Sequence, residues 1–227
     1  MEYLNENSML GENDDPNIES QLIALEDRYK ELPADATAID RAFMELQMAR
    51  LMIGLDRKDE SWGMARKVLD VFLDAQDWEK AVDACDVMFL AEQDTSISAL
   101  GQGIWLAVTY PIDPELTVAL LQHVVDETPD DADGAAVAAA TAIYITELRA
   151  EGKKKDNLLF FANQMLGQVS RRHSDIETQE QFDRWIEKME LNDPSKFLIR
   201  LRNVVDVLVQ DDWLFDRDEL QKALPVN

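Results

Sequence analysis

The sequence predicts an all-helical protein of about five antiparallel helix pairs in an α-solenoid arrangement. Apolar residues recur at intervals of three and four along most of the chain, which is the spacing of one face of an α-helix. No segment alternates apolar and polar residues over the length of a strand. The connections between helical segments are short, so we expect consecutive helices to lie antiparallel and side by side.

Ten helices are expected, and prolines and capping residues mark their ends. They are expected at residues 18–31, 36–55, 60–75, 77–91, 96–110, 113–127, 134–150, 155–172, 178–191 and 194–210, followed by a short helix at 212–223. The Asp-Pro pairs at 113–114 and 193–194 each place an N-cap before a proline, whose missing N–H costs nothing in the first turn. Asp77 and Asp133 are further expected N-caps.

Three of these helices are expected to form the centre of the protein. The segments 96–110, 113–127 and 134–150 are apolar on more than one side, and residues 135–146 carry no charge and many alanines. Helices that are apolar on most sides lie inside a protein, and alanine lets helix backbones approach closely. The helix at 77–91, by contrast, has one apolar face, opposite a polar face that includes Asp83 and Asp86.

The helix pairs begin near residues 18, 60, 96, 134 and 178, a spacing of 36–44 residues that is typical of helical-pair repeats. An aromatic residue followed nine positions later by alanine recurs at Tyr29 and Ala38, Phe72 and Ala81, and Tyr110 and Ala119. This pattern resembles the tetratricopeptide-type repeat, mainly over residues 60–127. Ala107 matches the small residue of that repeat in one copy, Leu69 departs from it in another, and the terminal proline is missing. The resemblance implies a superhelical scaffold that binds peptides or proteins, without assigning binding residues.

The chain is strongly acidic, with 46 Asp and Glu against 22 Lys and Arg and a net charge of −24. Between Lys80 and Arg149, 68 residues contain twelve acidic residues and no lysine or arginine. We expect this window to present a negative rim, which attracts basic proteins and repels nucleic acid. The expected partner-binding residues of the rim are Asp113, Glu115, Asp126, Glu127, Asp130 and Asp131.

A weaker candidate site lies in the C-terminal third, where residues 152–202 hold ten basic and eight acidic residues. Arg184, Lys188, Arg200 and Arg202 fall on the last two long helices there. They predict either solvated helix faces or a groove for an acidic peptide or a C-terminal carboxylate. The segment 211–216, with the sequence DDWLFD, is expected to cap the final helix pair, with a docking motif as the alternative.

Signals for catalysis or metal binding are weak, and no metal or other cofactor is expected. His123 and His173 are fifty residues apart and neither belongs to a Glu-x-x-His motif, so both are expected to be structural. The aspartates at 130–133 do not form an EF-hand loop, because its first and twelfth positions would be proline and alanine. Glycine-rich phosphate loops and nucleophile elbows are absent from the sequence. Cys85 lies on an apolar stripe and is expected to be a buried thiol.

The domain organisation expected is a disordered acidic tail at residues 1–17 and a single helical domain at 18–227. The tail lacks the basic and apolar regions of a signal peptide, and a lone cysteine fits a reducing compartment, so we expect a cytoplasmic location. The longest uncharged run, residues 95–112, contains serines, a glutamine and a proline, which favours a buried helix over a membrane span.

These observations favour a non-enzymatic interaction protein, an adaptor or assembly chaperone whose acidic surface binds a basic protein or peptide. Neither nucleic acid nor membrane is expected as a partner, and self-association stays open. Two alternatives remain. A net charge of −24 could imitate a phosphate backbone, as in an inhibitor or regulator of nucleic-acid-binding proteins. An all-helical enzyme with dispersed site residues is the other.

Overall fold

The computed structural model describes residues 16–222 and residue 224, which form helices and turns without a strand. The helices are α2 (Pro16–Lys30), α3 (Ala38–Gly54), α4 (Lys58–Asp74), α5 (Trp78–Leu90), α6 (Ser96–Thr109), α7 (Pro114–Glu127), α8 (Asp133–Arg149), α9 (Gly152–Ser174), α10 (Gln179–Lys188), α11 (Pro194–Val209) and α12 (Arg217–Lys222). The all-helical prediction is confirmed for this part of the chain. Residues 1–15 of the predicted tail lie outside the described residues, and α2 already includes the last two residues assigned to that tail.

Capping side chains set several helix starts as the sequence predicts. Asp77, Asp113 and Asp193 each accept a hydrogen bond from a backbone N–H in the first turn of the helix that follows. The prediction for Asp133 is wrong, because the residue before α8 is Ala132 and its side chain makes no capping hydrogen bond. Asp133 is instead the first residue of α8, and its carboxylate binds side chains from other helices.

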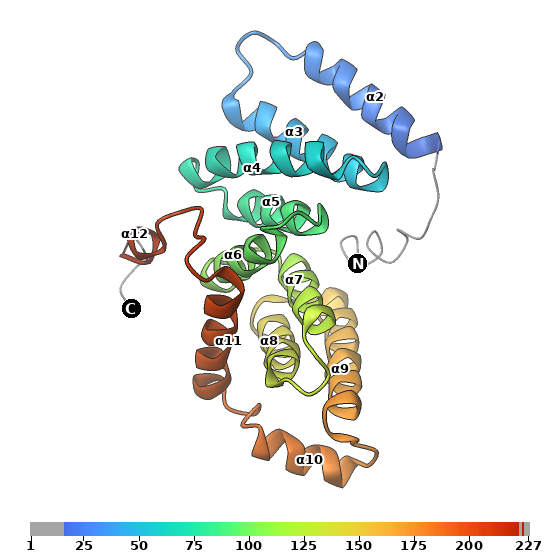
Figure 1. Ribbon diagram of the computed structural model, residues 1–227, viewed down its shortest axis with the longest axis vertical. Coiled ribbons are helices and arrows are strands. Elements are labelled where there is room, and N and C mark those ends of the chain that lie inside the picture. The colour runs from blue at the N-terminus through green and yellow to red at the C-terminus, as the bar shows by residue number, and fades with distance from the viewer. Residues whose placement is uncertain (1–15, 223, 225–227) are drawn as a thin grey trace.

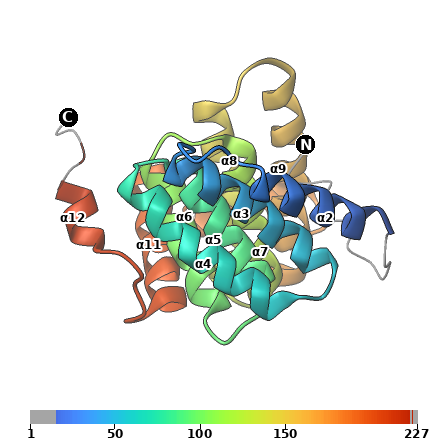
Figure 2. The same ribbon diagram turned by 90° about the horizontal axis from the view of Figure 1, so that it is seen from above.

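From α2 to α9, each helix packs against the next one along the chain (Figure 1). The molecule is elongated, with α2 at one end and α10 at the other (Figure 1). The view along this long axis shows α12 standing off to one side of the other helices (Figure 2). Within residues 16–222, no helix combines the length and the apolar content that crossing a bilayer requires.

The expected centre is confirmed, because α6, α7 and α8 bury residues on most of their faces. In α8 the buried residues are Ala135, Ala136, Val137, Ala138, Ala139, Ala140, Thr141, Ala142, Ile145 and Thr146. This helix packs against α7, α9 and α11. Its small side chains allow three helices to approach its backbone, which explains why the charge-free alanine segment lies at the centre.

The last long helix departs from the predicted fifth pair, because α11 packs on α6 and α8 rather than on α10 (Figure 1). Its buried face consists of Phe197, Leu201, Val205 and Val209. The preceding helix α10 has only ten residues, of which Trp185 is buried, so it offers little apolar surface to pair with. The chain therefore turns back at α10 and returns along the molecule.

Gly101 of α6 makes this return possible. A Cβ atom at Gly101 would lie 2.6 Å from Val209 Cγ2 and 2.9 Å from Leu208 Cβ, both on or next to the buried face of α11. Gly103 permits a similarly close approach between α6 and α5, because a Cβ atom at Gly103 would lie 2.9 Å from Cys85 Cβ. The expectation that this glycine pair permits close helix contacts is confirmed.

Two glycine substitutions are expected to change stability in opposite directions. Gly101→Ala should lower the free energy of unfolding by about 1–3 kcal/mol, because the added methyl overpacks the α6–α11 contact. Gly63→Ala in α4 should raise it by about 0.5–1 kcal/mol, because no atom of the described chain lies within 4 Å of the new Cβ and alanine favours the helix. Urea denaturation followed by circular dichroism measures both. Stabilisation by both substitutions would contradict the docking of α11 on α6.

Candidate functional site

The six acidic residues expected on one rim divide into two groups. Asp113 and Glu115 lie at the start of α7, where Lys154 of α9 reaches both of them. The Lys154 Nζ atom is 2.6 Å from each carboxylate oxygen of Asp113 and 3.5 Å from Glu115 Oε2. Glu115 is also only 5% exposed. The prediction that these two residues form an unbalanced negative rim is therefore wrong, because α9 supplies a cation from outside the cation-free window.

The other four residues do lie together on the surface, at the end of α7 and in the turn that leads to α8. We call Asp126, Glu127, Asp130 and Asp131 the acidic turn, and all four are exposed. Asp130 lies 3.6 Å from Arg172, and its side chain is 76% exposed. Within the described part of the chain, the other three form no ion pair with lysine or arginine. The acidic turn thus presents at least three uncompensated carboxylates over six positions.

Arg172 of α9 holds the acidic turn in place. Its guanidinium donates hydrogen bonds to the backbone carbonyls of Val125 and Thr128, at 2.5 and 3.4 Å. These carbonyls belong to the last turn of α7 and to its C-cap, where the helix itself offers no donor. The Thr128 hydroxyl also donates to the carbonyl of Val124, 2.6 Å away. The four carboxylates therefore project from a backbone that is tied to α9.

In a polar cluster next to the acidic turn, His173 contacts Ser174 through one ring nitrogen and Asp133 through the other. The Ser174 hydroxyl lies 2.6 Å from His173 Nδ1, and His173 Nε2 lies 3.2 Å from Asp133 Oδ1. These contacts resemble a hydrolase triad in order only. Trp185 Nε1 also donates to His173 Nδ1 at 3.4 Å, and Arg200 binds the second oxygen of Asp133 at 2.8 Å. Ser174 ends α9, where carbonyl groups would repel an oxyanion rather than stabilise it. The cluster joins the start of α8 to α9, α10 and α11.

The four basic candidate residues of the C-terminal third have different surroundings. Arg200 is half-buried and binds Asp133 and the carbonyl of Met189. Arg184 is exposed and lies 3.7 Å from Glu180 on its own helix. Lys188 and Arg202 are exposed, the first on α10 and the second on α11. Arg200 and Arg202 lie on α11, which packs on α6 and α8, and the groove for an acidic peptide stays a prediction.

Asp86, the most deeply buried charged residue among those described, belongs to a network that crosses three helices. Arg50 of α3 forms ion pairs with Asp83 and Asp86 of α5, and its Nη2 lies 2.9 Å from Asp86 Oδ2. His123 of α7 lies 3.2 Å from Asp86 Oδ1, and its ring packs on Phe89. Asp86 is 1% exposed, although its position in the helical pattern predicts a solvated face. That face is covered because α5 contacts α3 and α7 as well as its neighbours in sequence.

Burial and partner charges act against each other on the pKa values of this network. Burial alone would raise the pKa of Asp86, but Arg50 and His123 hold it below its usual value. Burial dominates at Asp83, whose pKa is raised although Arg50 pairs with it. The same contacts keep the pKa of Arg50 above its usual value. Asp86 is therefore a charged carboxylate enclosed by helices, and the network acts as a link between α3, α5 and α7. The expectation that His123 is structural agrees with this geometry.

Cys85, the candidate thiol of the sequence, is buried in α5. Burial raises the pKa of the Cys85 thiol to about 12, so the expected inert buried thiol is confirmed. No group of three or more His, Cys, Asp or Glu side chains within residues 16–222 could hold a metal ion. Shallow hollows of about 450 and 430 Å³ lie beside the start of α3 and at residues 56–60, away from both the acidic turn and the buried network.

Most acidic residues of the cation-free window acquire a cation from another part of the chain. Seven of the twelve form ion pairs with lysine or arginine, namely Asp83, Asp86, Glu92, Asp113, Glu115, Asp130 and Asp133. The cations are Arg50, Lys58, Lys154, Arg172 and Arg200, all outside the window. The acidic residues of the cation-free window therefore mostly link helices to one another. The acidic turn remains as an exposed concentration of negative charge.

Comparison with protein-family models, with curated proteins and with solved structures finds no match for this chain.

Proposed function

We propose that the protein is a non-enzymatic interaction protein, an adaptor or assembly chaperone, and that the acidic turn binds a basic partner protein. The observation that carries this proposal is the concentration of four exposed carboxylates over residues 126–131, projecting from a turn that Arg172 holds in place. Fixed negative charge speeds the encounter with a positive surface and sets its orientation.

The scaffold part of the proposal rests on how the helices follow one another. Helices α4 to α7, which contain the segment that resembles tetratricopeptide-type repeats, pack each against the next. We propose that this part is a short α-solenoid and that it displays the acidic turn rather than enclosing a substrate. The network around Asp86 supports this view, because its charged groups link helices and are enclosed by them. A cytoplasmic setting belongs to the same proposal, since it keeps the buried Cys85 reduced.

Neutralising the acidic turn is expected to slow association with the basic partner without unfolding the protein. The variant carries Asp126→Asn, Glu127→Gln, Asp130→Asn and Asp131→Asn, which preserve side-chain size. The partner is first captured on the wild-type chain at low salt and released at high salt. The association rate constant, measured by surface plasmon resonance at low ionic strength, should fall at least about threefold, and the difference should vanish in high salt.

The matched control neutralises four exposed acidic residues elsewhere, Glu31, Asp35, Asp74 and Asp94. It changes the net charge by the same amount but leaves the acidic turn intact, so its association rate should stay close to that of the wild type. Equal rates for the two variants would show that only the overall charge matters. If the captured partners are nucleic-acid-binding proteins that DNA displaces from the chain, imitation of nucleic acid replaces the adaptor function.

A further inference from the structure

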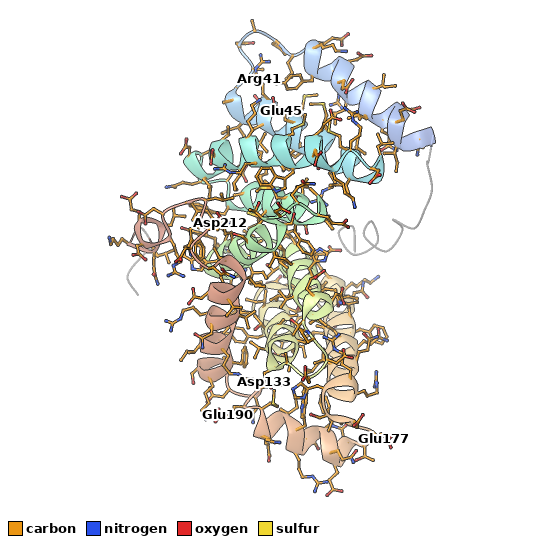
Figure 3. The ribbon with its side chains drawn as sticks, viewed as in Figure 1. Arg41, Glu45, Asp133, Glu177, Glu190 and Asp212 are labelled. Atoms are coloured by element: carbon orange, nitrogen blue, oxygen red, sulfur yellow. The ribbon has the colours of Figure 1, made fainter. Side chains whose placement is uncertain are left out.

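The segment of residues 211–216, which follows α11 and is neither helix nor strand, lies on α6 and is held there by its backbone. After α10, at the end of the molecule where Asp133 and Glu190 lie, α11 runs back and brings Asp212 beside α6 (Figure 3). The side-chain amide of Gln102 forms two hydrogen bonds with this segment. Its Nε2 atom donates to the carbonyl of Asp212 at 3.1 Å, and its Oε1 atom accepts from the N–H of Leu214 at 2.7 Å. Ser98 Oγ donates to the same carbonyl at 3.1 Å.

Gln102 is fully buried in a helix without charged residues, which is costly unless its amide is hydrogen-bonded. Its contacts with the segment involve backbone atoms only, so they recognise a peptide carbonyl and N–H at these positions whatever the side chains are. Side-chain recognition comes from Trp105 of α6, which contacts the rings of Trp213 and Phe215, with ring centroids 6.1 and 5.7 Å away. Main-chain hydrogen bonds combined with contacts to alternate side chains are how proteins commonly bind extended peptides.

A tight turn with a strained residue joins residues 211–216 to the end of α11. Gln210 connects it to α11 with φ 52° and ψ −122°, and the N–H of Asp212 bonds to the carbonyl of Val209 at 3.0 Å. These values place Gln210 at a turn position that favours glycine. Beyond the segment, α12 buries none of its residues, and Arg217 holds it by an ion pair with Asp206 and by a contact with the ring of Trp213.

We propose that the surface formed by Ser98, Gln102 and Trp105 is a peptide-binding slot that residues 211–216 occupy in the free protein. The ligand it takes from another protein is an acidic peptide that carries two aromatic residues separated by one position and adopts the conformation of this segment. The aspartates around Trp213 and Phe215 are exposed in the bound segment, so acidic residues fit beside the two aromatic positions. This slot is distinct from the acidic turn and does not depend on the function proposed for it.

Hydrogen exchange of the wild-type protein tests whether the segment opens. The amides of residues 211–216 should exchange by local opening, at least about 100-fold faster than the amides of residues 99–106 in α6. Gln210→Gly removes the strain and should slow exchange of the segment several-fold. Exchange of the Leu214 amide at the same rate as α6 would mean that the segment leaves only on global unfolding, and would overturn the proposal.

Binding is tested with the full chain carrying Trp213→Ala and Phe215→Ala. These substitutions remove the two rings that contact Trp105. The probe is a fluorescent peptide of residues 210–218, QDDWLFDRD, with QDDALADRD as the control peptide. By fluorescence anisotropy the probe should bind this variant at least about tenfold more tightly than it binds the wild type. Adding Gln102→Leu should weaken binding about tenfold again, because the peptide N–H and carbonyl lose their partner. A folded variant that does not bind the probe would refute the slot.

The exchange experiment uses the wild-type chain, so it can still overturn the proposal if the double variant fails to fold. A second copy of the chain also carries residues 211–216 and could supply them in exchange. Concentration-dependent dimers of the wild type that the probe peptide dissociates would assign the slot to that exchange, and would overturn the proposal of a separate partner.

Discussion

Ala142→Arg is expected to lower the free energy of unfolding by at least about 4 kcal/mol, a large part of the roughly 5–15 kcal/mol by which proteins are usually stable. Ala142 is fully buried in α8, a helix that contacts α7, α9 and α11. Arginine adds volume that this contact cannot accept without moving helices apart. It also places a guanidinium in the hydrophobic core, and an unpaired buried charge is strongly destabilising.

The control for this substitution is Ala24→Arg in α2, where the alanine is exposed and the helix is equally regular. That change should alter the free energy of unfolding by no more than about 0.5 kcal/mol. Urea denaturation of both variants, followed by far-ultraviolet circular dichroism, measures the difference. A normal unfolding midpoint for Ala142→Arg would mean that α8 does not lie at the centre of the molecule.

The position of α8 could be predicted from the sequence because it depends on properties of the segment itself. A run without charge cannot face solvent over its whole length, and alanines favour both a helix and close packing. The helix starts at Asp77, Asp113 and Asp193 were predictable for the same reason, since capping depends on neighbouring residues. Local patterns therefore identified most of the helices and the central ones among them.

The burial and the partners of side chains that meet helices distant in the sequence could not be predicted from local patterns. Asp86 follows the polar side of its helical pattern, and only the approach of α3 and α7 buries it. Glu115 is paired by Lys154, 39 positions further along the sequence, because α9 returns to α7. Gln102 was visible only as the residue between two glycines. Its contact with residues 212–214 depends on the direction in which α11 runs, for which the chain has no local signal.

Arg50→Ala is expected to lower the free energy of unfolding by about 3–5 kcal/mol at pH 7, because it leaves the carboxylates of Asp83 and Asp86 without their cation. The matched control is Arg66→Ala, which removes the same side chain from a more exposed pair with Asp70 on one helix. That pair spans one helical turn and contributes about 0.3–0.5 kcal/mol. Urea denaturation of both variants and the wild type at pH 7 measures the two costs.

The pH dependence separates the loss of charge pairing from the loss of packing around Arg50. In the wild type the pKa of Asp86 is below its usual value, so its contribution is present above the unfolded pKa of about 3.9 and is lost as pH falls through the folded pKa. Without Arg50, only His123 opposes the effect of burial on Asp86, and we expect burial to raise the pKa of both aspartates. A carboxylate with a raised folded pKa destabilises the protein most at neutral pH, and protonation removes that cost as the pH falls. The difference between Arg50→Ala and the wild type should therefore narrow between pH 7 and pH 5. A difference that stays constant over this range would show that Arg50 stabilises the helices by packing alone.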